Sequence, residues 1–125
     1  MRLYHALLAA LCLVASACTT PQALPVTNES VTLIINFEAS DEGLAEFSGI
    51  MDGVSSAMLT EPGFVSAKVY RNVESPNRFV LVEVWASKAL HQEHFDRINQ
   101  SGDWAHINSL LTSAPVMGYY RPDGE

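Results

Sequence analysis

Two apolar segments separated by a short turn constrain the fold of this chain most strongly. Residues 64–71 and 78–85 are rich in β-branched and aromatic side chains, and residues 72–77 between them include Pro76. This pattern predicts an antiparallel hairpin. If Arg71 pairs with Arg78 beside the turn, one face of the hairpin carries Phe64, Ser66, Tyr70, Phe79, Glu83 and Trp85.

The opposite face of the predicted hairpin is also apolar. It carries Val65, Ala67, Val69, Val80, Val82 and Val84. A four-stranded sheet with helices on one side covers only one of its two faces. We therefore expect a second surface, outside this arrangement, to bury the valine side of the hairpin.

The segments before the hairpin show first a strand pattern and then a helix pattern. Residues 31–37 predict a strand that is largely buried on both faces, with Asn36 as its polar exception. Ser40 suits the cap of a helix of about five turns. The apolar residues of this helix recur at helical spacing, at Leu44, Phe47, Met51, Val54 and Met58.

Two more helices and a strand are expected after the hairpin. Ser87 suits the cap of a helix over residues 88–98. Asp103 suits the cap of a shorter helix, which ends before Pro115. Residues 116–120 predict the last strand. The order β-α-β-β-α-β predicts an α+β, ferredoxin-like fold, in which an antiparallel sheet is backed by helices.

The amino terminus has the pattern of an export signal. Arg2 precedes an apolar run over residues 6–17, which is shorter than the roughly 20 residues that a membrane-spanning helix needs. The run ends in Ala15-Ser16-Ala17, directly before Cys18. We therefore expect residues 1–17 to be a signal peptide that is cleaved after Ala17.

The residues around this cleavage site fit two mature forms. Ala15 and Ala17 suit an ordinary signal peptidase, which would release a secreted protein. Small residues directly before Cys18 resemble a bacterial lipobox, which would attach lipid to Cys18 and anchor the chain in the cell envelope. We favour the second form, with residues 18–30 as a lipidated cysteine and a flexible tether. In a Gram-negative cell, Thr19 indicates the periplasmic face of the outer membrane.

The remaining residues, 31–122, are expected to form one acidic domain. The chain has 7 basic and 14 acidic residues, and loss of Arg2 with the signal peptide changes the net charge from -7 to -8. This charge argues against nucleic acid as a partner. Because both cysteines, Cys12 and Cys18, precede the domain, it has no disulfide and no thiolate nucleophile.

Several short sequences in this domain resemble the antibiotic biosynthesis monooxygenase family. They are Glu61-Pro62-Gly63-Phe64, the strand 79–85 followed by Ala86-Ser87, and His94 in the next helix. Their order and spacing resemble the family's running pattern over about residues 31–122. The resemblance implies a dimeric α+β barrel, a homodimer whose two sheets pack face to face and cover the valine side of each hairpin.

The resemblance also implies a chemistry. It is the cofactor-free oxygenation of a small electron-rich aromatic compound, such as a phenol, quinol or anthrone, between the sheet and the helices. No metal is required, because such a substrate can pass an electron to oxygen once it has lost a proton. The candidate catalytic residues are His94, Glu83 and Asn36, and the candidate substrate-binding residues are Trp85, Phe64 and Tyr70.

Each of these candidates also has a structural explanation. Glu83 can pair with Lys68 diagonally across the hairpin, so its charge need not be catalytic. Trp85 can fill the core, and His94 can pack on the same helical stripe as its apolar neighbours. Asn36 can satisfy its amide at backbone edges.

Three other functions remain open. A haem-degrading branch of the same family relies on an Asn, a Trp and a His, which Asn36, Trp85 and His94 would supply. His91-x-x-His94 also has the spacing of two metal ligands on one helical face, but a third ligand with firm spacing is lacking. Finally, the domain can be a non-catalytic, stress-related module that holds a small lipophilic molecule at the cell envelope.

Overall fold

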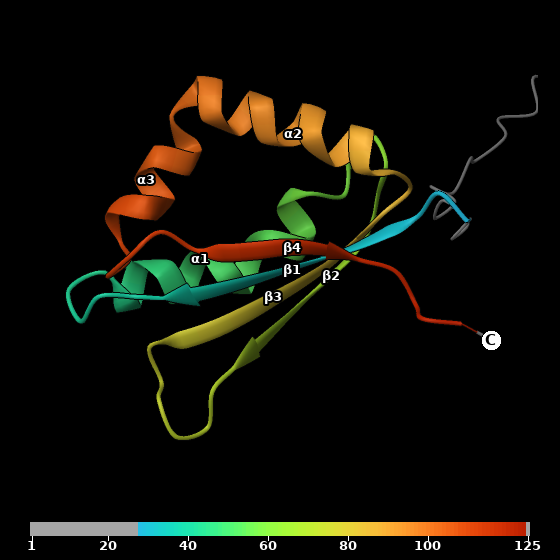
Figure 1. Ribbon diagram of the computed structural model, residues 1–125. Coiled ribbons are helices and arrows are strands. Elements are labelled where there is room, and N and C mark those ends of the chain that lie inside the picture. The colour runs from blue at the N-terminus through green and yellow to red at the C-terminus, as the bar shows by residue number, and fades with distance from the viewer. Residues whose placement is uncertain (1–27, 125) are drawn as a thin grey trace, which may run out of the picture.

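A computed structural model describes residues 28–124 of the chain (Figure 1). The predicted signal peptide, Cys18 and most of the predicted tether lie outside these residues. The elements follow the order β1 (Val31–Glu38), α1 (Leu44–Ala57), β2 (Phe64–Arg71), β3 (Arg78–Trp85), α2 (Lys88–Ser101), α3 (Asp103–Ser109) and β4 (Val116–Tyr120). Over this range, no helix has the length and apolar character needed to cross a membrane.

The four strands form one antiparallel sheet in the order β2-β3-β1-β4. The two central strands, β3 and β1, are therefore not neighbours in sequence, because α1 and β2 lie between them along the chain. This arrangement confirms the predicted ferredoxin-like α+β fold.

One face of the sheet is covered by the three helices, and we call it the covered face. Figure 1 shows α2 and α3 running above the sheet, with α1 beside it. Leu33, Ile35 and Phe37 of β1 lie on this face and are buried. Phe47 of α1 packs against Phe37 and Phe79, with ring centroids 5.1 Å apart in both pairs. The main core of the domain therefore lies between the sheet and the helices.

The helix ends partly follow the expected caps. Ser87 Oγ accepts a hydrogen bond from the backbone N–H of Leu90 and caps α2, as predicted. Ser40 Oγ instead accepts from the N–H of Gly43, which is itself the residue before α1, so it closes the preceding turn. The helix has 14 residues, about four turns, and is shorter than predicted because Met58 already lies in its C-terminal cap.

Gly63 explains why the sequence Glu61-Pro62-Gly63 joins α1 to the hairpin. Its φ of 84° lies in the left-handed region that favours glycine. A Cβ at this position would also lie 2.5 Å from a side-chain carbon of Leu90 on α2. The glycine therefore permits both the turn and the close approach of α2 to the start of β2.

The hairpin contains an irregularity that the sequence-based register lacked. Phe64 pairs with Trp85 as expected, but the register shifts between Phe64 and Ser66, so Tyr70 pairs with Val80 rather than with Phe79. Val65 is the extra residue of a β-bulge. Beyond the bulge every side chain of β2 lies on the face opposite to the predicted one. Ala67 and Val69 thus belong to the covered face, whereas Ser66, Lys68 and Tyr70 do not.

The other face of the sheet, which we call the open face, is not covered by any element among residues 28–124. It carries Thr32, Ile34, Asn36, Ser66, Lys68, Tyr70, Val80, Val82, Val84 and Val116. Its central residues Ile34, Val80 and Val82 are half-buried, whereas Asn36 and Tyr70 are exposed. Within one subunit, β1 is therefore buried on one face only, which corrects the expectation of burial on both.

Candidate functional site

A cavity of about 340 Å³ lies between the covered face and the helices. Its volume is within the range of small-molecule sites, roughly 300–1,000 Å³. Most of its lining is apolar and comes from the sheet and all three helices, including Ile35, Phe37, Ile50, Met51, Val54, Met58, Leu81, Phe95, Ile98, Trp104, Ile107 and Met117. The polar side chains in the lining are Glu83, His91, His94, Asp103 and His106.

Glu83 provides a buried carboxyl group to this cavity. It lies on β3, and its residue is only 4% exposed. The indole Nε1–H of Trp85, two residues along the strand, donates a hydrogen bond of 2.7 Å to Oε2 of Glu83. Burial raises the pKa of Glu83, and the Trp85 hydrogen bond partly opposes this shift. A buried carboxylate with a raised pKa is suited to accept a proton.

His91 lies on the other side of the Glu83 carboxyl. The hydroxyl of Tyr119 on β4 is 2.5 Å from its Nδ1. Burial, and then the charge of Glu83, raise the pKa of Tyr119, so its hydroxyl keeps a proton that it can donate to Nδ1. Burial, and then the charge of His94, lower the pKa of His91 to about 4, so its ring is neutral at pH 7. The ring then carries its own proton on Nε2, which lies 4.0 Å from Oε2 of Glu83.

The ring of His91 is held by aromatic neighbours as well. It makes edge contacts with Trp85 and Tyr119, at centroid distances of 5.1 and 5.4 Å, and it stacks with Phe95 at 6.1 Å. These contacts, together with the Tyr119 hydroxyl, fix the orientation of Nε2. The Nε1–H of Trp85 therefore donates to Oε2 of Glu83, and Nε2 of His91 lies near the same oxygen.

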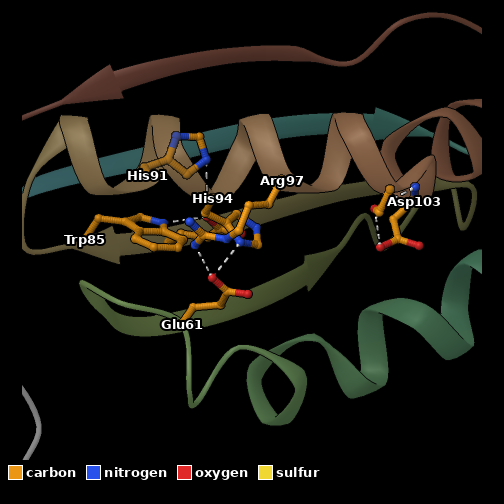
Figure 2. Close-up of polar contacts among 8 residues, drawn as sticks. Glu61, Trp85, His91, His94, Arg97 and Asp103 are labelled. Carbon is orange, nitrogen blue, oxygen red and sulfur yellow. Dashed lines mark hydrogen bonds and ion pairs between the residues drawn. The ribbon is translucent and has the colours of Figure 1, made fainter.

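His94 is one turn further along α2 and faces Glu61. Its Nδ1 lies 3.2 Å from Oε2 of Glu61, without hydrogen-bond geometry to any of the residues described. The same oxygen accepts a hydrogen bond of 2.5 Å from Arg97. Figure 2 shows Glu61 directed at both side chains. The pKa of Glu61 is lowered, chiefly by Arg97 and then by His94, so Glu61 is ionised at neutral pH.

The predicted catalytic residues Glu83 and His94 both line this cavity. Trp85 is fully buried and lies behind the lining, where its edge packs against Phe64 at a centroid distance of 5.7 Å. Neither Trp85 nor Phe64 belongs to the lining residues, so the structure does not support their predicted role as pocket walls. Trp85 instead contacts the cavity through Glu83.

Asn36 and Tyr70 lie on the open face and not at this cavity. Asn36 pairs with Val80 and Val116, and its side chain alternates away from the buried Ile35. Tyr70 was predicted to share a face with Glu83, but the bulge at Val65 places it on the other side. Lys68, predicted as a partner of Glu83, is also on the open face, with its ammonium group 5.2 Å from the Tyr70 ring centroid.

The separation of Asn36 from Trp85 and His94 bears on the haem alternative. That alternative required the three residues around one ligand, but the sheet lies between Asn36 and the cavity. The three residues therefore do not fit a shared haem site within one subunit. In addition, no group of three or more metal-ligating side chains is present within residues 28–124.

Three residues of the site, His91, Tyr119 and Glu61, were not predicted from the sequence. His91 was considered only as a metal ligand, although its spacing of three from His94 places both on one helical face. Tyr119 could have been found from the alternation of β4, because it pairs with Leu33 of the covered face. Glu61 was recognised only as part of the turn sequence, and nothing local in the sequence indicates its contact with α2.

Comparisons with known proteins agree with this fold. The sequence profile described as antibiotic biosynthesis monooxygenase matches residues 30–107. None of the proteins of curated function matches the chain.

Several solved structures have a similar fold. Rv0793 of Mycobacterium tuberculosis is 21% identical, with a TM-score of 0.66 over 77% of this chain and 97% of that one. A conserved protein of Methanosarcina mazei is 17% identical, with a TM-score of 0.66 over 75% and 93%. SnoaB of Streptomyces nogalater, a cofactor-independent oxygenase, is 18% identical, with a TM-score of 0.65 over 78% and 96%. At these identities the likeness concerns the fold.

Proposed function

The chain belongs to the antibiotic biosynthesis monooxygenase family, and from this premise we propose that it oxygenates a small electron-rich aromatic compound without a cofactor. Phenols, quinols and anthrones are the proposed substrate class. The observation that carries the proposal is the cavity of about 340 Å³, whose apolar walls surround the carboxyl group of Glu83. The fold of SnoaB, a cofactor-independent oxygenase, is consistent with it.

In the proposed reaction Glu83 is the group that removes a proton from the substrate. The resulting carbanion passes an electron to O2, and the two radicals combine to form a carbon–oxygen bond. The proton held by Glu83 then returns to the outer oxygen of the peroxide. The oxygen–oxygen bond breaks as the second hydrogen on the same carbon leaves as a proton, which joins the departing hydroxide to form water. For an anthrone, the CH2 group and O2 become a carbonyl group and water, so no external reductant is needed. The apolar walls exclude water from the carbanion.

His94 and Trp85 have separate roles in this proposal. His94 lines the cavity beside Glu83, so it contacts the substrate and can hydrogen-bond to a substrate oxygen. Trp85 is a positioning residue, because its Nε1–H holds Oε2 of Glu83 at 2.7 Å. The second oxygen of Glu83, Oε1, makes no hydrogen bond to the residues described and is the proposed proton acceptor.

Oxygen uptake with an anthrone and with a quinol tests the proposal. The wild-type protein should consume O2 faster than the uncatalysed background and form the quinone product. Glu83→Gln should lower kcat/KM by about 100-fold, the lower end of the contribution of a general base. Glu93→Gln, an exposed change of the same kind on α2, serves as the control and should leave the rate unchanged. Equal rates for wild type and Glu83→Gln would contradict the role of Glu83.

A non-catalytic binding function is the second candidate, because three methionines contribute to the cavity. Met51, Met58 and Met117 are flexible side chains that can adapt to ligands of different shapes. In that case a lipophilic ligand would bind tightly, and no O2 would be consumed with any of the aromatic substrates above. Mass spectrometry of protein purified from its own host under native conditions would detect such a ligand.

We also propose that two subunits pair through their open faces. Ile34, Val80, Val82 and Val84 form an apolar centre on this face, and none of the elements of residues 28–124 covers it. Burial of these side chains between two sheets would remove them from water. The molecular mass of the protein in solution tests this pairing.

We propose, finally, that the domain is exported and anchored by lipid at Cys18 to the bacterial cell envelope. The support is the apolar segment 6–17 and the small residues before Cys18. Fractionation of cells that express wild type or Cys18→Ser tests this anchor. The wild-type protein should be in the membrane fraction and Cys18→Ser should not, whereas equal distribution of the two would contradict lipidation.

A further inference from the structure

We infer that the cavity selects an uncharged ligand with a hydroxyl or N–H donor and discriminates against carboxylates and other anions. This inference rests on the proposed function, because it narrows the ligand class of the same cavity. It is carried by the charges around the cavity rather than by its size.

No lysine or arginine belongs to the cavity lining of the residues that the structure describes. The acidic groups in the lining are Glu83 at the sheet and Asp103 at the start of α3. An anionic ligand would therefore lose its hydration and meet carboxylates without a neighbouring permanent cation. Only the three histidines of the lining are left to compensate its charge.

Each of these histidines is either neutral or already paired with an acid. His91 is neutral at pH 7, because burial and the charge of His94 keep its pKa near 4. His94 faces Glu61 at 3.2 Å, and Arg97, which lies outside the lining, binds the same carboxylate oxygen. His106 has its Nε2 2.7 Å from Oε1 of Glu46 on α1. Four acidic groups, Glu83, Asp103, Glu61 and Glu46, therefore lie in or next to the lining and outnumber the three positive charges that Arg97, His94 and His106 can carry there.

The orientation of Glu83 gives the cavity an acceptor instead. Oε2 accepts from Trp85 at 2.7 Å, and Nε2 of His91 lies 4.0 Å from the same atom. The Tyr119 hydroxyl holds His91 in the orientation that this requires. Oε1 is left to accept a hydrogen bond from a ligand. Trp85, His91 and Tyr119 are therefore positioning residues for the ligand acceptor.

A matched pair of aromatic probes tests this charge selection in the full chain. At pH 7 2-naphthol is uncharged and has a hydroxyl donor, whereas 2-naphthoate has the same ring system with a negative charge. Binding is measured by isothermal titration calorimetry without oxygen, so turnover does not contribute. We expect 2-naphthol to bind at least about tenfold more tightly than 2-naphthoate.

The variant Glu83→Gln links this preference to the proposed acceptor. The amide oxygen of the new side chain can still accept from Trp85, so the fold is expected to persist, but the amide NH2 group then faces the cavity in place of Oε1. We expect 2-naphthol to lose about tenfold in affinity and the difference between the two probes to shrink. The control Glu93→Gln should retain the wild-type preference.

Three results would overturn the inference. They are equal or tighter binding of 2-naphthoate by the wild type, an unchanged preference in Glu83→Gln, and absence of binding by both probes. The binding preference is measured without oxygen, so it can be present or absent whether or not the protein oxygenates a substrate. A protein that selects 2-naphthol but consumes no O2 with anthrones or quinols would retain this ligand class and lose the proposed reaction.

Discussion

The two faces of the sheet differ in what covers them, although both carry large apolar side chains. On the covered face Leu33 is fully buried, and the helices leave a cavity that contains Glu83. On the open face the adjacent Ile34 is only half-buried, together with Val80, Val82 and Val84. The covered face therefore supplies a closed core and a cavity within one subunit, whereas the apolar side chains of the open face stay partly in water unless the proposed second subunit covers them.

The largest effect is expected from a pair of neighbouring substitutions that compares the two faces directly. Leu33→Ala should destabilise the domain by about 3–4 kcal/mol, because it leaves a hole in the closed core. Ile34→Ala should cost only about 1 kcal/mol within a subunit, and its effect should depend on protein concentration if the open face pairs. Urea unfolding at two protein concentrations measures both. If both variants lose the same stability at both protein concentrations, the proposed difference between the two faces is wrong.

Trp85→Phe tests how the covered face holds its carboxyl group. The variant keeps an aromatic ring but removes the donor to Glu83 and some buried volume, so we expect a loss of roughly 2–3 kcal/mol in stability. The apparent pKa of Glu83 should rise, because the lost hydrogen bond lowers it in the wild type. Thermal unfolding and a pH profile of ligand binding measure the two effects. An unchanged pH profile would show that Trp85 only fills space.

The bulge at Val65 shows where the sequence was informative and where it was not. The bounds of β2, β3 and β4 follow from β-branched and aromatic runs between turn residues, and the fold was predicted from their order. A valine at the bulge looks like any other strand residue, so the shift that moves Tyr70 to the open face left no signal. The alternation of Ser66, Ala67, Lys68 and Val69 is consistent with either face.

The candidate site, like the register of the hairpin, was predicted from the sequence only in part. Glu83 and His94 were identified because they belong to the sequence pattern that resembles the family. Tyr119, the partner of His91, and Glu61, which faces His94, are far away in sequence from α2. Only the three-dimensional packing of β4 and of the turn before β2 brings them to this helix. Asn36 stood out as the polar residue of an apolar strand, but its strand position places it on the open face.

Acid should weaken the covered face through His91. Its pKa is about 4 in the folded protein and 6.5 in the absence of burial, so the unfolded chain binds a proton more readily in this range. Stability should therefore fall by ~1–2 kcal/mol as the pH decreases from 6.5 toward 4. Melting temperatures of wild type and His91→Gln at pH 7 and pH 5 test this. Between pH 7 and pH 5 the melting temperature of the wild type should fall further than that of His91→Gln. Equal decreases in the two proteins would exclude His91 as the cause.

The smallest effect is expected at Asn36, which lies on the open face. Asn36→Ala should change O2 uptake and 2-naphthol affinity by less than about twofold, since exposed substitutions away from a site usually alter stability by under 0.5 kcal/mol. A steady-state oxygen assay and calorimetry measure this. A loss of tenfold or more would mean that Asn36 reaches a functional site, as the haem alternative required.

Sedimentation equilibrium of the mature protein and of Val82→Asp tests the division between the two faces most directly. Val82 lies at the centre of the open face, and a buried aspartate there would oppose pairing. The wild type and the control Leu59→Asp, an exposed position after α1, should have the mass of a dimer. Val82→Asp should have the mass of a monomer. A wild type that is monomeric when dilute, or a Val82→Asp variant that stays dimeric, would contradict the account.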